Sequence, residues 1–197
     1  MPQTGAIILA AGLSKRMGHD KLNLPFGLNY SFLSNILAGF HTFGSSPVVV
    51  VVNPLSEPQA RTISTGTGGA TVVVVNDAPE KGRFRSLQLG LREIGSDFPV
   101  FIQNVDNPFV DAVLLQQMLH AAPDGDFVVP VFNSKGGHPV LLNTVVTLQI
   151  IRCSEPSTAL NSFLKAYRKV TVPATDSRIL LNINTPEDYR DFLRLST

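Results

Sequence analysis

Ala6-Ile7-Ile8-Leu9-Ala10-Ala11-Gly12-Leu13-Ser14-Lys15-Arg16-Met17-Gly18, followed closely by Lys21, is the stretch that decides the fold. Its first four residues form an uninterrupted apolar run, which predicts a central strand buried on both faces. Small residues, two glycines and three cations follow the strand. A strand that ends in a small, basic loop is typical of an open α/β sheet, which binds ligands at the carboxyl ends of its strands.

This loop suits the binding of phosphate groups. Gly12 and Gly18 allow backbone angles that a Cβ would forbid, and the alanines let a ligand lie against the main chain, so that backbone N–H groups can point at an anion. A hydroxyl, a guanidinium fork and an ammonium group add further phosphate contacts. The alternative is a surface loop whose basic residues are merely solvated, but cations, glycines and a strand end coincide here. The predicted nucleotide-binding residues of the loop are Leu9, Ala10, Ala11, Gly12, Ser14, Arg16 and Lys21, of which Arg16 and Lys21 are also predicted to be catalytic.

Composition indicates one folded domain over residues 1–197, long enough to bury a full core. The 16 basic and 15 acidic residues give a net charge of +1, so a general nucleic-acid surface is not indicated. The single Cys153 excludes an internal disulfide and is a poor candidate for a metal site. The sequence shows neither a membrane-spanning run nor a secretory signal, and we therefore expect a cytoplasmic protein.

Apolar runs alternate with segments of helical spacing along the first two thirds of the chain, which predicts βαβ crossovers and a mostly parallel sheet in a three-layer α/β/α fold. The nucleotide-binding half is predicted at about residues 1–110 and the acceptor-binding half at about 111–197. Thr185 is expected to cap a last helix that has Pro186 at its first position. Predicted strands are 6–9, 48–52, 71–75, 100–103, 127–131, 138–142 and 169–172, and predicted helices lie near 32–40, 57–67, 87–94, 113–119, 157–167 and from 186 onward.

Asp106 follows the apolar run Val100-Phe101-Ile102-Gln103. Because the carboxyl ends of parallel strands share one edge of a sheet, this carboxylate is expected beside the Gly12 loop, where it could hold Mg²⁺ against a triphosphate. Mg²⁺ needs only one or two protein oxygens when phosphates and water supply the other ligands. The alternative is an Asx turn in which Asp106 and Pro108 serve geometry alone.

The loop matches neither G-x-x-x-x-G-K-[ST] nor G-x-G-x-x-G. Its pattern, L-A-A-G-x-S-x-R-M-G-x-x-K, resembles the signature of the nucleotidyltransferases with a glycosyltransferase-A-like, Rossmann-like fold, in particular the molybdenum cofactor group and, within it, the cytidylyltransferases. The resemblance implies that Asp106 is the metal-binding aspartate of a G-D-x-P-like turn, although Val105 replaces the glycine. It also implies a second metal contact from the C-terminal loop. There the chain has Asn182-Ile183-Asn184-Thr185-Pro186-Glu187-Asp188, where the cytidylyltransferases have D-I-D-T-P-E-D and the guanylyltransferases N-x-N-T-P-E-D, and Asn184 is the predicted ligand beside Asp106.

Two further stretches resemble family motifs. The segment from Asn76 to Leu87 corresponds to a glycine and paired serines that close over the base and phosphates. Gly82 and Ser86 fit this pattern, whereas Arg83, Phe84 and Arg85 depart from it; the arginines either attract a second phosphorylated partner or form a solvated basic loop. Gly136-Gly137-His138-Pro139 resembles the G-H-P-x-L run beside the acceptor. These matches add Asp77 and Ser86 as predicted nucleotide-binding residues, and Gly137 and His138 as acceptor-binding residues. Asn53, which follows the predicted strand 48–52, is also a predicted nucleotide-binding residue; the alternative is that it merely ends the strand.

The resemblance implies an enzyme that uses Mg²⁺ to transfer CMP or GMP from CTP or GTP to a phosphorylated small molecule such as molybdopterin, releasing pyrophosphate. An acceptor phosphate is already ionised at neutral pH, so positioning and charge neutralisation would carry the rate. No nucleic-acid or membrane partner is expected, while transient contact with a protein of the molybdoenzyme pathway is. Two alternatives are a sugar- or lipid-precursor phosphate nucleotidyltransferase and a nucleotide-binding regulatory protein that has lost turnover.

Overall fold

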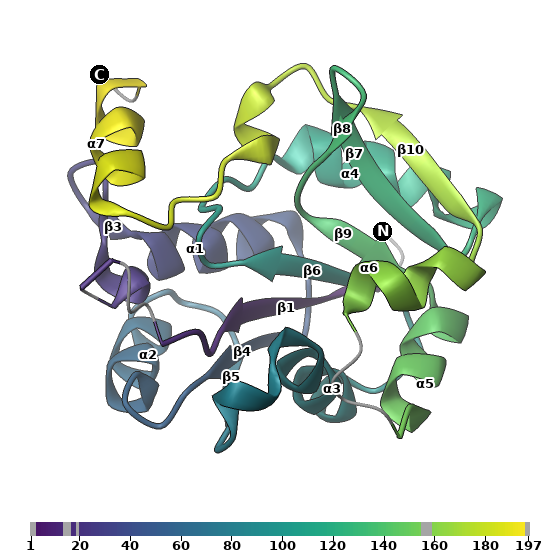
Figure 1. Cartoon of the computed structure of the whole chain (residues 1–197), viewed down its shortest axis with the longest axis horizontal. Helices are drawn as coiled ribbons and strands as arrows, with labels where there is room; N and C mark the ends of the chain where they lie inside the picture. Colours follow the sequence, from purple (N-terminus) through teal and green to yellow (C-terminus); the bar gives the residue numbers. More distant parts are fainter. Residues whose placement is uncertain (1–2, 14–16, 19, 155–158, 196–197) are drawn as a thin grey trace.

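An eight-stranded, mostly parallel sheet organises the residues described by the computed structural model, which are 3–13, 17–18, 20–154 and 159–195 (Figure 1). The strand order is β10-β7-β9-β6-β1-β4-β5, with β8 paired to β7. Strands β6, β1, β4 and β5 pair in parallel, as do β7 and β10, whereas β9 runs antiparallel to both β6 and β7. The strands are β1 (Gly5–Ala10), β4 (Val48–Val52), β5 (Thr71–Val75), β6 (Val100–Asn104), β7 (Phe127–Phe132), β8 (Lys135–Gly136), β9 (Val140–Leu142) and β10 (Lys169–Pro173), with β2 (Pro25–Phe26) and β3 (Tyr30–Ser31) in a separate hairpin.

Helices cover both faces of the sheet, which confirms the predicted three-layer α/β/α fold. Strand β1 shows why: Ala6, Ile8 and Ala10 pack with one helical layer, and Ile7 and Leu9 pack with the other. Burial of an isoleucine such as Ile7 or Ile8, both fully buried, stabilises the fold by about 1.5–3 kcal/mol. One layer holds α1 (Phe32–Phe43), α2 (Glu57–Thr65), α4 (Ala112–Ala121) and α7 (Pro186–Leu195), and the other holds α3 (Arg83–Ile94), α5 (Thr144–Arg152) and α6 (Leu160–Phe163).

The helix ends follow from local chemistry. Ser31 caps α1 in a reciprocal pair with Ser34, and Gly44, at φ 91°, ends that helix in the left-handed conformation. Asp111 accepts hydrogen bonds from two backbone N–H groups at the start of α4. Thr185 accepts from Asp188 N at 3.2 Å at the start of α7, which confirms the predicted cap.

Several predicted elements differ in extent. Strand β9 begins at Val140, two residues later than predicted, because Pro139 has no N–H to donate to a ladder. Helix α2 ends at Thr65, and α6 begins at Leu160. Of the two helix starts that the sequence allows, Ser154 is not helical, and Ser157 lies outside the described residues.

Helix α5 is absent from the sequence prediction because its β-branched residues favour a strand locally. Tertiary packing decides instead, since Val146, Thr147 and Ile150 are buried on one helical face. No helix in the described ranges is both long and apolar enough to cross a membrane.

Candidate active site

A cavity of about 470 Å³ opens at the carboxyl ends of β1 and β6. Its walls come from the loop after β1, the turn after β6, the first turn of α3 and the loop before α7. Parallel pairing of β1 with β6 brings these segments to one edge of the sheet, as the sequence predicted. The predicted residues that line this cavity are Leu9, Ala10, Ala11, Gly12, Lys21, Ser86, Asp106 and Asn184.

The glycine loop is described only in part, because Ser14 and Arg16 lie outside the described residues. Gly18 has φ +73°, a conformation that favours glycine, as predicted. Gly12 is not in this conformation, so the expected backbone requirement is wrong there, and a Cβ at Gly12 would meet no atom within 4 Å. Its lack of a side chain instead leaves space beside the cavity, which it lines.

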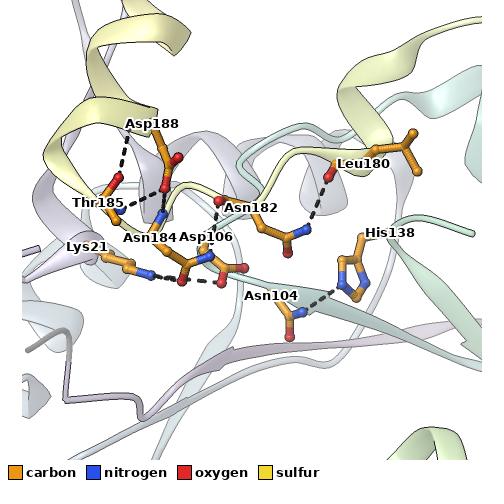
Figure 2. Close-up of polar contacts among 9 residues, drawn as sticks. All are labelled: Lys21, Asn104, Asp106, His138, Leu180, Asn182, Asn184, Thr185 and Asp188. Atoms are coloured by element: carbon orange, nitrogen blue, oxygen red, sulfur yellow. Dashed lines mark hydrogen bonds and ion pairs between the residues drawn. The ribbon is translucent and has the colours of Figure 1, made fainter. Parts of the chain in front are cut away.

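Lys21 directs its ammonium group toward two oxygen-bearing side chains (Figure 2). Its Nζ donates to Asn184 Oδ1 at 2.7 Å and lies 3.9 Å from Asp106 Oδ2. The side chains of Lys21 and Asp106 are only 10% and 9% exposed. In this arrangement the Asn184 oxygen serves the ammonium group of Lys21, so its assignment as a metal ligand stays a prediction.

The turn after β6 is fixed by main-chain contacts rather than by the Asp106 side chain. Asp106 O accepts from Ile183 N at 2.9 Å, and Val105 N donates to Leu9 O at 3.1 Å. Within the described residues Asp106 Oδ1 is buried without a hydrogen-bond partner. Asn107 makes the Asx contact instead, accepting from Phe109 N at 3.3 Å. The geometry-only alternative for Asp106 therefore lacks support, and its buried carboxylate oxygen fits a hard cation such as Mg²⁺.

The loop before α7 is held by its own helix. Asp188 Oδ2 accepts from Asn184 N at 2.9 Å and from Thr185 N at 2.8 Å (Figure 2). These hydrogen bonds, led by the one from Asn184 N, lower the pKa of Asp188 below its usual value. Asn184 Nδ2 donates to Asn182 O, while the Asn182 amide donates to Leu180 O at 3.1 Å. The contacts thus direct Asn184 toward Lys21, and Asn182 is engaged outside the cavity wall.

The start of α3 contributes the second predicted segment. Gly82, at φ +93°, precedes the helix, and Ser86 lies in its first turns. Asn76, fully buried after β5, donates to Ser86 Oγ at 2.9 Å and accepts from Ala78 N at 3.0 Å. Asn76 is an organising residue that the sequence prediction missed.

Two predicted nucleotide-binding residues lie outside the cavity wall. The Asp77 side chain is 79% exposed and pairs with Arg85 at 2.9 Å; this hydrogen bond and charge lower the pKa of Asp77. Asn53 Oδ1 accepts from Leu55 N and Ser56 N, which ends β4, and Asn53 Nδ2 lies 3.4 Å from Gly12 O. The structure thus supports the strand-ending role of Asn53, with one contact to the glycine loop.

Gly137 and His138 line a second, adjoining cavity of about 930 Å³. Gly137 is required by packing, since a Cβ there would overlap the Ile179 carbonyl. Burial lowers the pKa of His138 to about 4, so its ring is neutral at pH 7. Asn104 Nδ2 lies 2.7 Å from His138 Nε2, and with the amide nitrogen as donor the ring proton lies on Nδ1, which is buried without a partner in the described part of the chain (Figure 2).

Side-chain amides are the functional residues that sequence reasoning underestimated. Asn104 holds His138, and Asn107 donates to Arg178 O at 3.1 Å and Ile179 O at 2.9 Å, which ties the C-terminal segment to the Asp106 turn. The sequence signal that could have identified these residues is the group of amide side chains around Asp106, directly after a buried strand. Among the described residues no group of three or more His, Cys, Asp or Glu side chains forms a metal cluster, so a cation here would need ligands from its substrate.

Two curated proteins are similar to this chain along nearly its whole length. The chain is 28% identical over 197 residues to a probable molybdenum cofactor guanylyltransferase of Mycobacterium avium, covering 95% of this chain and 94% of that protein. It is 23% identical over 189 residues to the molybdenum cofactor cytidylyltransferase of Escherichia coli, covering 96% and 95%.

Solved structures share the fold. A nucleotidyl transferase from Methanothermobacter thermautotroptrophicus superposes with a TM-score of 0.78 at 22% identity, covering 98% of this chain and 96% of that one. Rv0371c from Mycobacterium tuberculosis in complex with manganese superposes with a TM-score of 0.72 at 20% identity, covering 98% of each chain. The family model of the MobA-like NTP transferase domain matches residues 6–171. The chain therefore belongs to the MobA-like NTP transferase family.

Proposed function

We propose that this chain is a Mg²⁺-dependent nucleotidyltransferase that moves CMP or GMP from CTP or GTP to a phosphorylated acceptor such as molybdopterin. The observation that carries the proposal is the position of Asp106, which lines the same cavity as the small-residue loop and Lys21 and whose Oδ1 is buried without a partner among the described residues. A polyphosphate fits this cavity because the loop after β1 is small and Lys21 supplies a positive charge. The names of the relatives support molybdopterin as the acceptor class.

In the proposed reaction an acceptor phosphate oxygen attacks the α-phosphorus of the nucleotide. The bond from the α-phosphorus to its bridging oxygen breaks, and pyrophosphate leaves with the electron pair. Lys21 would hold the phosphates, and the start of α3 would direct backbone N–H groups at them. When bound, Mg²⁺ would neutralise phosphate charge; Asp106 would hold the ion, together with Asn184 if Lys21 releases that oxygen.

The two cavities support separate binding sites for the nucleotide and the acceptor within one domain. We infer that the first half of the chain, about 1–110, binds the nucleotide, with Asn184 reaching back from the second half. The acceptor would occupy the second cavity, where residues of the second half, including Gly137 and His138, form much of the wall. The proposal includes both CTP and GTP as donors, because N-x-N in the C-terminal loop matches the guanylyltransferases and G-H-P matches the cytidylyltransferases.

The test is release of pyrophosphate from each of the four nucleoside triphosphates with Mg²⁺ and molybdopterin. We expect release with CTP or GTP that depends on both the acceptor and the metal. A thermal-shift screen of the same nucleotides identifies the preferred base, because a ligand of the native state raises apparent stability. Tight nucleotide binding that is indifferent to Mg²⁺ and without release would favour a regulatory protein. Release with a sugar phosphate in place of molybdopterin would favour the other enzyme class.

A further inference from the structure

Arg83 occupies the boundary between the two cavities. It is the first residue of α3, its side chain is exposed, and it lines both the 470 Å³ cavity and the 930 Å³ cavity. The described residues common to both walls are Leu9, Gly82, Arg83 and Asn104. Arg83 is the charged member of this set, so a ligand that passes from one cavity to the other meets its guanidinium.

The second cavity has a one-sided charge. Its described lining contains four cationic side chains and no Asp or Glu, whereas the first cavity contains Asp20 and Asp106 as well as cations. Phe84 and Tyr167 are among its ring-bearing wall residues, and His138 adds a neutral imidazole whose Nδ1 has no partner among the described residues. An anion with a planar, partly apolar body fits these walls. The cations are Lys81, Arg83, Lys165 and Lys169.

Arg83 differs from its neighbour Arg85 in what balances its charge. Arg85 pairs with Asp77 at 2.9 Å and also donates to Asn76 Oδ1 at 3.3 Å, and it lines neither cavity. Within the described residues Arg83 forms no ion pair. The charge of Arg83 therefore remains available to an anion at the cavity boundary.

We propose that Arg83 binds the phosphate of the acceptor at this boundary and thereby selects phosphorylated acceptors; this inference rests on the proposed function. Its planar fork contacts two phosphate oxygens and leaves a third directed toward the nucleotide in the first cavity. The position departs from the glycine-and-serine pattern implied by the family resemblance, so the role belongs to this chain. Lys81, Lys165 and Lys169 contribute long-range attraction, and Arg83 orients the group that reacts.

The experiment compares Arg83→Ala and Arg83→Lys with Arg92→Ala, which removes the same charge from the far end of the same helix. Arg92 is exposed and lines neither cavity. We expect Arg83→Ala to raise KM for molybdopterin about 10- to 100-fold, the range for loss of a charge-assisted hydrogen-bond pair, while nucleotide affinity changes less than about 3-fold. Arg83→Lys should recover part of this loss, and Arg92→Ala should match the wild type. Equal KM values for all four proteins would overturn the proposal.

Equilibrium binding separates this inference from the proposed function. Fluorescence titration with molybdopterin and with its dephosphorylated form needs no turnover, and Arg83→Ala should abolish the preference for the phosphorylated form. If the wild type binds molybdopterin without transfer, the proposed function fails while Arg83 is still tested. If the wild type does not bind molybdopterin, glucose 1-phosphate and methylerythritol 4-phosphate replace it. Binding of either compound that is equal in wild type and Arg83→Ala, or no binding of any of these phosphomonoesters, overturns the inference.

Discussion

Replacement of Asp106 by Asn separates the stability of the fold from the chemistry of the site. The carboxylate is buried, Oδ1 has no partner in the described ranges, and Oδ2 is 3.9 Å from Lys21 Nζ. At that separation the attraction is roughly 4 kcal/mol for an effective dielectric constant of about 20. Burial of each ion costs several kcal/mol, which offsets this attraction. The pair therefore contributes little net stability.

The Asp106→Asn variant keeps the shape of the side chain and removes its charge. Lys21 keeps its hydrogen bond from Nζ to Asn184 Oδ1 at 2.7 Å, and the carboxylate of Asp188 still interacts with its charge. We expect the free energy of unfolding to change by no more than about 1 kcal/mol in either direction. Turnover should fall by about 100-fold or more, because the developing phosphate charge loses its metal-binding carboxylate.

Urea unfolding followed by circular dichroism measures the first quantity, and a coupled pyrophosphate assay measures the second. Asp97→Asn, which replaces an exposed acid that lines neither cavity, is the control and should change neither. A loss of more than about 2 kcal/mol with turnover retained would show that the carboxylate is structural and would refute the reasoning.

Three further predictions concern other parts of the site. Because burial holds the pKa of His138 at about 4, below its ordinary 6.5, the unfolded chain binds more protons between these pH values. Stability should therefore fall as pH drops through this window, by up to about 3 kcal/mol, and urea titrations at pH 7 and 4 should show a smaller fall in His138→Gln. If Asn184 acts through Lys21, adding Asn184→Ala to Lys21→Ala should cause no further loss of nucleotide affinity, as measured by calorimetry with Mg²⁺ and CTP or GTP. Additive losses of affinity would contradict this coupling. Gly137→Ala should lose about 1–3 kcal/mol by overlap with a backbone carbonyl, whereas Gly66→Ala, whose Cβ has room, should stay within about 0.5 kcal/mol in the same urea assay.

The sequence predicted the sheet well because its strands are locally unambiguous. Val48–Val52 and Thr71–Val75 occur as predicted, since β-branched residues favour strands and both runs are bounded by turn residues. Helix α5 was not predicted, because its β-branched residues favour a strand locally and packing holds them in a helix. The β2–β3 hairpin was missed because two-residue strands carry no periodicity.

Within the site, main-chain position was predictable and side-chain partnership was not. The glycine loop and Asp106 meet because each follows a strand of one parallel pair, a relation that the order of strands implies. The contact between Lys21 and Asn184 joins residues 163 positions apart and depends on how Asp188 holds the last loop. Asn76, Asn104 and Asn107 likewise act through partners that only the folded chain brings near, and an amide carries no charge by which a sequence pattern would reveal it.

The proposed reaction must bring two anions together, the nucleoside triphosphate and the acceptor phosphate, which repel each other. The distribution of charge between the two cavities reduces this repulsion. The first cavity contains acidic and basic groups, so a cation can reside there with a triphosphate. The second cavity contains only basic ionised groups in its described lining, so it attracts an acceptor anion without an ion of its own. A neutral His138 in the second cavity adds no repulsion toward a cation on Asp106, and protonation would add it. The low pKa of that histidine is thus consistent with a boundary at which Arg83 supplies the positive charge.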